Sequence, residues 1–152
     1  MNSTHNEKLK EGYRKVTLDY NPKLFVTLTT NQPLSVAAMR RLIGRYMARM
    51  DRLNLGRNWK KRSAAERIDG IFFIESVYTN THTHALLKVP YGNRMGLQLA
   101  SDEIWAKLCP SGSVRIKPIY NLNGLYNYVT KEDWKTRFFE EQLVFATEFM
   151  GS

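Results

Sequence analysis

The stretch from Ile68 to Pro90 constrains the fold of this chain more than any other, because it has the pattern of a β-hairpin. Residues 71–77 and 82–89 are both rich in β-branched, aromatic and other apolar side chains. Thr79-Asn80 lies between them and is a natural two-residue turn. The sequence therefore predicts two antiparallel strands that supply the middle of a sheet.

This turn determines which side chains lie opposite each other. It would pair Val77 with His82 and Glu75 with His84. Because side chains alternate between the two faces of a strand, Glu75, His82 and His84 would project from one face. Imidazole nitrogens and a carboxylate oxygen suit a divalent cation, so these three residues are candidate ligands of Mn²⁺ or Mg²⁺. The alternative is a polar sheet face on which Glu75 pairs with an arginine.

The rest of the chain alternates between strand-like and helix-like patterns, which is typical of an α+β protein. The expected elements are a strand at 24–30, a helix capped by Ser35, a basic loop at 54–67, a helix at 102–108 capped by Ser101, a strand at 114–120, a helix that begins at Asn121 or Asn123, and a helical segment at about 133–150. No repeat or low-complexity linker divides the chain, so we expect one domain over residues 1–152.

Positive charge is concentrated in the first half of the chain. Residues 1–70 hold 15 basic and 6 acidic side chains and residues 71–152 hold 8 of each, which together give the net charge of +9. This density favours a polyanion such as nucleic acid as partner, although a solvated basic face or a membrane-surface helix would also fit. The candidate DNA-binding residues are Arg41, Arg45, Arg49, Arg52, Arg57, Lys60, Lys61 and Arg62. Trp59 or Tyr78 could stack on bases, and Trp59 is equally suited to anchoring the basic loop.

Composition excludes several other classes of protein. With 43% apolar residues the chain can build a core, which excludes a disordered tail. No apolar run approaches the roughly 20 residues that span a bilayer, and the N-terminus lacks the apolar stretch of a signal peptide. We therefore expect no membrane partner and a cytoplasmic location. The single cysteine, Cys109, allows neither an internal disulfide nor a cysteine-based zinc site.

A third motif lies near the end of the chain. On the helix that begins at Asn121 or Asn123, Tyr128 and Lys131 would share one face, whereas Tyr126 would point elsewhere. Taken alone, this pattern is more typical of aromatic residues that pack a helix onto a sheet.

Three motifs in order make the chain resemble the HUH endonucleases, specifically the single-tyrosine rolling-circle replication initiator (Rep) nuclease domains. They are Phe25 to Thr30, His82-Thr83-His84 and Tyr128 to Lys131, and the resemblance covers about residues 23–132. It departs from the family at Thr83, where a bulky apolar residue is usual. Tyr126 and Tyr128 are two residues apart, which excludes the arrangement of two nucleophilic tyrosines one helical turn apart.

The resemblance implies both a fold and an activity. The fold would be a central antiparallel sheet of five strands flanked by helices, of the ferredoxin-like or RRM-like kind. The activity would be metal-dependent nicking and joining of single-stranded DNA at a replication origin or hairpin, in a plasmid or virus, with a helicase of the host as a possible partner. Glu75, His82 and His84 would hold the metal ion, Tyr128 would form a 5′-phosphotyrosine, and Lys131 would contact the phosphate or favour the tyrosinate by its charge.

Three alternatives to a replication initiator stay open. A small HUH transposase would use the same histidine pair and a helix tyrosine. A conjugative relaxase normally has a third histidine in place of Glu75. An RRM-like nucleic-acid-binding module without catalysis would have a similar sheet and basic face, but would not need Glu75, His82 and His84 together.

Overall fold

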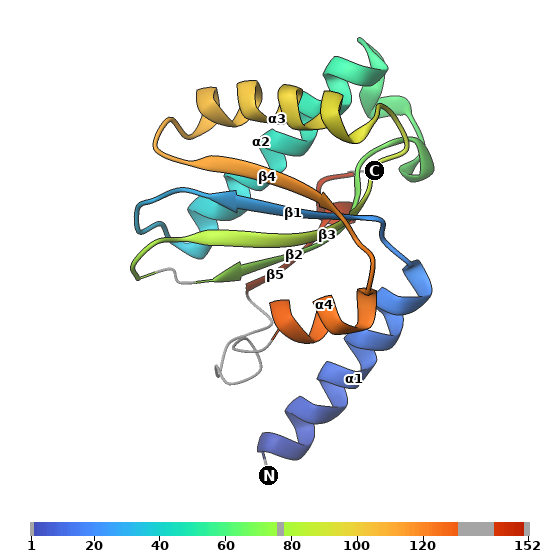
Figure 1. The fold of residues 1–152 in the computed structure, drawn as a ribbon, viewed down its shortest axis with the longest axis vertical. Helices are drawn as coiled ribbons and strands as arrows, with labels where there is room; N and C mark the ends of the chain where they lie inside the picture. Colours follow the sequence, from blue (N-terminus) through green and yellow to red (C-terminus); the bar gives the residue numbers. More distant parts are fainter. Residues whose placement is uncertain (1, 76–77, 131–141, 151–152) are drawn as a thin grey trace.

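The computed structural model describes residues 2–75, 78–130 and 142–150 and shows one five-stranded sheet (Figure 1). The strands are β1 (Leu24–Thr29), β2 (Asp69–Glu75), β3 (His82–Lys88), β4 (Ser113–Pro118) and β5 (Leu143–Phe145). Their order is β4-β1-β3-β2-β5, and every neighbouring pair is antiparallel. The predicted α+β architecture with a five-stranded antiparallel sheet is confirmed, and the predicted hairpin strand β3 is its centre.

Helices cover both faces of the sheet (Figure 1). They are α1 (Asn2–Tyr20), α2 (Val36–Leu55), α3 (Arg94–Leu108) and α4 (Leu122–Val129), with 3-10 turns at Trp59–Lys61, Ala64–Glu66 and Ala146–Phe149. Helices α2 and α3 lie on one face, and α1 and α4 lie on the other. Among the described residues, no helix combines the length and the apolar character that a membrane crossing requires.

Alternation along the strands divides the core into two layers. Val26 of β1 and Phe72 of β2 are fully buried in the layer that contains α2 and α3. Phe73, the next residue on β2, belongs to the second layer, together with Tyr126 and Val129 of α4. Burial of such a side chain contributes roughly 1.5–3 kcal/mol, so both layers stabilise the sheet. Glu75, His82 and His84 are an even number of residues from Phe73 or Leu86 on their strands, so they lie on the face of the sheet that α1 and α4 cover.

The hairpin register differs from the expected one by two residues. Glu75 lies opposite His82 and Phe73 lies opposite His84, so the predicted pairing of Glu75 with His84 is wrong. The predicted partner of His82, Val77, lies outside the described residues. The connection is longer than the two-residue turn at Thr79-Asn80, because β2 ends at Glu75 and β3 begins at His82. A shift of two residues keeps each side chain on its face, and the predicted shared face survives.

Of the two predicted serine caps, one is confirmed and the other is wrong. Ser35 caps α2 as predicted, since its hydroxyl accepts the N–H of Ala38 at 3.1 Å. Ser101 does not cap a helix, because α3 begins at Arg94 behind Asn93. Ser101 is instead buried within α3, with its hydroxyl 2.9 Å from the Tyr46 hydroxyl. A serine at one turn of a longer amphipathic helix gives the same local signal as a cap.

The ends of the chain depart most from expectation. Helix α1 has no counterpart among the expected elements, and its Leu9 and Tyr13 pack against the layer that contains α4. Residues 143–145, expected to be helical, form the strand β5, so this part of the expected segment 133–150 is wrong, whereas residues 146–149 form a 3-10 helix. β5 pairs with β2 and is the edge strand on that side of the sheet. Residues 131–141 lie outside the described part of the chain.

Candidate metal centre

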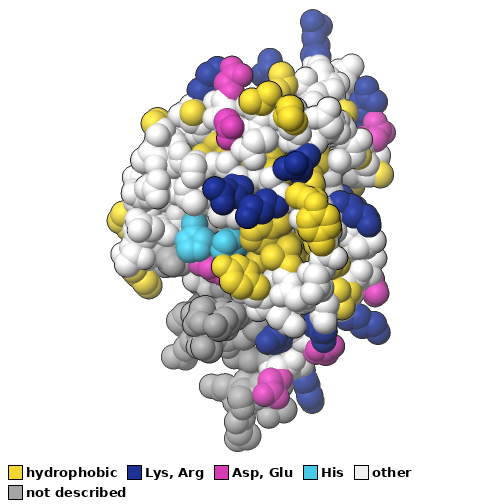
Figure 2. All heavy atoms as spheres, viewed as in Figure 1, with side chains coloured by type: hydrophobic (Ala, Val, Ile, Leu, Met, Phe, Trp, Pro, Cys, Tyr) yellow, Lys and Arg dark blue, Asp and Glu magenta, His cyan; other side chains and the backbone are white. Residues whose placement is uncertain are grey.

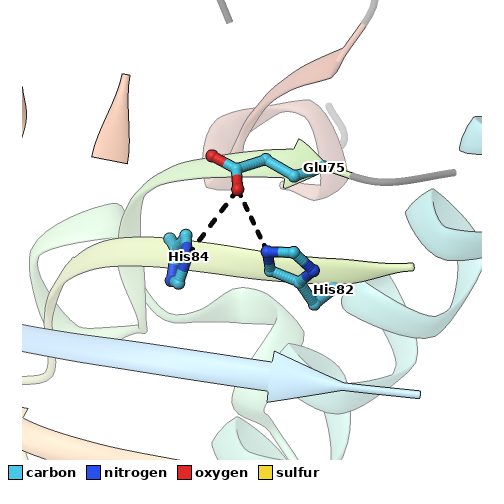
Figure 3. Close-up of side chains that lie close together, drawn as sticks. All are labelled: Glu75, His82 and His84. Atoms are coloured by element: carbon cyan, nitrogen blue, oxygen red, sulfur yellow. Dashed lines mark hydrogen bonds and ion pairs between the residues drawn. The ribbon is translucent and has the colours of Figure 1, made fainter. Parts of the chain in front are cut away.

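Three potential metal ligands meet on the α4 side of β2 and β3 (Figure 3). Oε2 of Glu75 lies 3.0 Å from Nε2 of His82 and 3.8 Å from Nε2 of His84. One ligand atom from each residue can be chosen so that all lie within 4.8 Å of one another. All three side chains are partly buried, and the sheet fixes their backbones. The cluster could therefore hold a metal ion.

Hydrogen bonds on the far side of each ring orient the two imidazoles. Nδ1 of His82 lies 3.1 Å from the carbonyl oxygen of Asn80. A carbonyl oxygen can only accept, so Nδ1 carries the hydrogen and donates it, and in the neutral ring the Nε2 lone pair points at Glu75. Nδ1 of His84 lies 3.3 Å from the Thr27 hydroxyl, which can hold this ring in the same tautomer. A lone pair that faces a carboxylate needs a cation between them, which a metal ion or a proton supplies.

Electrostatics favour the neutral form of His84. Burial lowers the pKa of His84 below its usual value, and the positive charge of a protonated His82 would lower it further. The carboxylate of Glu75 opposes both effects without cancelling them. Phe25 stacks on the His84 ring with a centroid distance of 5.4 Å and restricts its rotation. A neutral, oriented imidazole is the form that binds metal ions.

The two tyrosines of α4 have different surroundings. Tyr128 is 67% exposed, and its ring centre lies 6.3 Å from that of His84. Tyr126 is fully buried, contacts Phe73 edge to face, and its hydroxyl donates to the carbonyl oxygen of Lys10 at 3.4 Å. Tyr128 therefore borders the cluster, whereas Tyr126 belongs to the core, and the two side chains point apart as the helix geometry predicts.

A groove of about 330 Å³ runs from the cluster across β1 to β4. It is lined by Phe25, Thr27, Thr29, His84, Ser113, Arg115, Lys117 and Tyr128. We call it the sheet groove. Figure 2 shows histidine side chains beside Lys and Arg side chains and hydrophobic side chains in the middle of this face. The groove thus combines one potential metal ligand, His84, with the phenol of Tyr128 and two cations, Arg115 and Lys117.

Sequence reasoning missed Arg115 and Lys117. Alternation with the buried Val114 and Ile116 is visible in the sequence and could have placed both cations on one side of β4. That this side is the one with the metal ligands follows only from the pairing of β4 with β1, in which Thr27 lies opposite both Arg115 and His84. The expected phosphate contact, Lys131, lies outside the described residues.

The structure places the candidate DNA-binding residues away from the cluster. Arg41, Arg45, Arg49 and Arg52 are on α2, in the layer on the opposite face of the sheet, and Arg57, Lys60, Lys61 and Arg62 are in the segment that follows α2. None of these eight residues lines the sheet groove. The basic helix and the metal ligands therefore cannot hold the same nucleotide.

Trp59 and Tyr78, the two candidates for base stacking, also differ in their environment. The guanidinium of Arg67 lies 5.1 Å from the centre of the Trp59 ring, and the ring lines a small cavity with residues of α2. This arrangement agrees with a tryptophan that anchors the basic loop. Tyr78 is 92% exposed in the connection between β2 and β3.

Comparisons with known proteins add little to this site. No protein-family model matches the chain, and no curated protein matches it. The crystal structure of the hypothetical protein ORF119 from Sulfolobus islandicus rod-shaped virus 1 is similar in fold, with a TM-score of 0.48 and 16% sequence identity. The alignment covers 84% of this chain and 95% of that one.

Proposed function

We propose that this protein is a metal-dependent endonuclease that nicks and joins single-stranded DNA through a covalent tyrosine intermediate, as the resemblance to the HUH replication initiators implies. One observation carries the proposal. The exposed phenol of Tyr128 borders His84 on the same face as Glu75 and His82, in a groove that also contains cations. A nucleophile, metal ligands and phosphate-binding side chains are the parts that phosphodiester transfer needs.

The donor set fits a divalent cation. Glu75 offers a carboxylate oxygen, and His82 and His84 offer Nε2 lone pairs that their Nδ1 contacts direct inwards. Two nitrogen donors favour Mn²⁺ over Mg²⁺, which prefers an all-oxygen environment. When bound there, the cation would supply positive charge beside the scissile phosphate, an effect commonly worth several kcal/mol.

Tyr128 is the proposed nucleophile. Its Oη would attack the phosphorus, the new P–Oη bond would form, and the bond from phosphorus to the 3′-oxygen would break. The phenolic proton would leave to solvent, and the departing 3′-oxygen would take up a proton. The product is a 5′-phosphotyrosine and a free 3′-hydroxyl, and the reverse attack rejoins the ends because one ester bond replaces another.

Arg115 and Lys117 are the proposed phosphate contacts next to the nucleophile. Both project from β4 into the sheet groove, and charge-assisted hydrogen bonds to phosphate oxygens would hold the strand across β1. The cations of α2 would reach DNA only on the other face of the sheet, for example a duplex flanking the nick. Lys131 stays a proposed contact to the phosphate.

The biological setting that we propose is the initiation of rolling-circle replication in a plasmid or virus, with the origin strand or its hairpin as substrate and a host helicase as partner. A transposase or relaxase of the same superfamily would use the same chemistry on other DNA. Nicking of an origin hairpin, as opposed to excision of an element with defined ends, distinguishes these activities.

A trapped adduct tests the nucleophile. The protein is incubated with Mn²⁺ and a pool of single-stranded oligonucleotides, and a denaturant-resistant protein–DNA adduct is sought. Tyr128→Phe should abolish the adduct without unfolding the protein, because only the exposed hydroxyl is removed. Tyr126→Phe is the matched control and should retain the adduct while losing about 1 kcal/mol of stability with its hydrogen bond. A nucleotide mass on Tyr126 of the wild-type protein would refute the assignment.

Thermal unfolding with and without metal tests the cluster independently. Saturating Mn²⁺ should raise the melting temperature of the wild-type protein, since about 100-fold excess over Kd stabilises the folded state by roughly 2.7 kcal/mol. His82→Ala with His84→Ala should remove this shift and DNA cleavage, and should leave DNA binding largely intact. His5→Ala, which changes the third histidine of the chain, is the control. Nucleic-acid binding without any metal response would favour the non-catalytic RRM-like alternative.

A further inference from the structure

We propose that a second site, at the other end of β3 from His82, binds a nucleotide. The site is a cavity of about 660 Å³, which we call the basic end cavity. Besides Arg67, its cations are Lys23, Lys88 and Arg94, and its apolar walls include Leu24, Val89 and Leu97. Ligand pockets for small molecules have volumes of about 300–1,000 Å³, so a nucleotide fits this space.

Two of the cations are brought together where β1 and β3 meet the cavity. The backbone N–H of Lys23 donates to the carbonyl oxygen of Leu87 at 3.0 Å, and Leu87 directly precedes Lys88. The side chains of Lys23 and Lys88 both line the cavity. Like charges that share a site repel each other, so a bound anion would offset an electrostatic cost here.

The third cation, Arg94, lies at a position where positive charge is unfavourable for the helix. Arg94 is the first residue of α3, directly after the cap Asn93, whose side chain accepts the N–H of Gly96 at 2.8 Å. The N-terminus of a helix carries partial positive charge, so an arginine there is unfavourable by a few tenths of a kcal/mol. A residue that is unfavourable for local stability and makes no compensating contact is expected at a functional site.

Acidic side chains do not neutralise this group. The carboxylate of Asp51 pairs with Arg67, another lining residue, at 3.2 Å. Asp69 lies opposite Lys88 on β2 and lowers the charge of the cavity by one, yet it is not within ion-pair distance of Lys88. Within the described part of the chain, Lys23, Lys88 and Arg94 form no ion pair. Three cations thus face one carboxylate, Asp69.

The shape and lining of the cavity select the class of anion. A free phosphate would need only the cations, whereas the apolar walls of Leu24, Val89 and Leu97 call for an uncharged, planar part. The Nζ of Lys88 already lies 4.3 Å from the centre of the Tyr20 ring, so Lys88 is held above an aromatic face. A nucleotide supplies both a phosphate for the cations and a base for the apolar walls.

The basic end cavity is separate from the metal centre. Six residue steps along β3 separate His82 from Lys88, which is roughly 20 Å. The cavity would therefore bind a free nucleotide, or a nucleotide of a DNA strand, without contact with Tyr128 or the metal ligands. The inference does not depend on the nicking activity, and the experiment can be carried out with chelator present.

The test measures binding of deoxyadenosine 5′-monophosphate to the full chain by NMR titration in EDTA. Deoxyadenosine and inorganic phosphate serve as partial ligands. We expect amide shifts at Leu24, Val89 and Gly92, with the nucleotide bound more tightly than either part. Lys23→Gln with Arg94→Gln should weaken binding by about tenfold or more, because two charge-assisted contacts are lost. Lys15→Gln with Lys107→Gln, which removes the same charge from exposed sites elsewhere, should change it less than about twofold.

Several outcomes would overturn the proposal. They are amide shifts confined to the sheet groove, equal affinity of the wild-type protein and the Lys23→Gln, Arg94→Gln variant, or phosphate binding as tight as that of the nucleotide. The mapping on the wild-type protein decides the matter even if the variant does not fold.

A short single-stranded oligonucleotide then distinguishes the two sources of nucleotide. If a DNA strand occupies the cavity, Lys23→Gln with Arg94→Gln weakens oligonucleotide binding as well. If a free nucleotide is the ligand, the variant loses only the mononucleotide. Both results support a nucleotide site. If the variant binds the mononucleotide and the oligonucleotide as tightly as the wild-type protein does, the proposal is refuted.

Discussion

The side chain between the two histidines offers a sharp test of the packing. Thr83 is fully buried, and alternation along β3 turns it away from His82 and His84, towards the layer that contains α2. Among the described residues, its hydroxyl is the buried side-chain group without a hydrogen-bond partner. Thr83→Val replaces this hydroxyl with a methyl group of nearly the same size and leaves no cavity.

The expected gain follows from the desolvation of that hydroxyl. A buried polar group without a partner costs about 1–3 kcal/mol, and its removal should stabilise the fold by at least about 1 kcal/mol. For a chain of this size, each kcal/mol corresponds to a melting temperature about 2–4 °C higher. The metal ligands on the other face of β3 are unchanged, so Mn²⁺ binding should be unaffected.

Thr81 provides a matched control two residues earlier. It is also fully buried, but its hydroxyl accepts the N–H of Leu34 at 2.7 Å and donates to the Leu34 carbonyl oxygen at 3.0 Å. Thr81→Val should therefore destabilise the protein by about 1–3 kcal/mol. Urea denaturation of both variants in EDTA measures the two changes. Destabilisation by Thr83→Val would show that its hydroxyl has a partner and refute the reasoning.

Three further predictions concern other buried groups. Asp51→Asn should cost about 3–5 kcal/mol in urea denaturation, because it leaves the buried guanidinium of Arg67 without its counterion; a loss below about 1 kcal/mol would contradict a buried ion pair. Gly112→Ala should cost at least about 2 kcal/mol, since the new Cβ would overlap the carbonyl oxygen of Thr29; a melting temperature equal to that of the wild type would disprove the close approach. Burial raises the pKa of Tyr46 to about 12, above its unfolded value of about 10, so its contribution to stability is present below pH 10 and is lost as the pH rises towards 12. Between pH 10 and pH 12, the free energy of unfolding of Tyr46→Phe should therefore fall by about 2 kcal/mol less than that of the wild type. Equal falls in the two proteins would refute a raised pKa of Tyr46.

The hairpin shows which part of the site the sequence could predict. Glu75, His82 and His84 are close in the chain, and alternation assigns them to one face whatever the exact length of the turn, provided that the register shifts by an even number. The register itself was predicted wrongly, because strand patterns do not reveal how many residues the connection takes. The helix capped by Ser35 was likewise predictable, since its cap and its apolar spacing are local features.

Helix α1 and strand β5 show the opposite case. The 19 residues of α1 have few apolar side chains, and the helix contacts residues more than a hundred positions away, as Tyr13 does with Phe145 and the Lys10 carbonyl oxygen with the Tyr126 hydroxyl. β5 has three residues and gains its pairing from β2. Such elements depend on tertiary contacts that local propensity does not contain.

By itself, the sequence determined an α+β chain with an antiparallel hairpin, a carboxylate and two imidazoles on one face of it, and a strongly basic first half. The tertiary structure alone decided that the basic helix α2 lies behind the sheet and that Arg115 and Tyr128 lie beside His84. The physical reason is the range of the interactions. Alternation and capping act over a few residues, whereas the face that a helix covers and the neighbour that a strand selects depend on burial summed over the whole core.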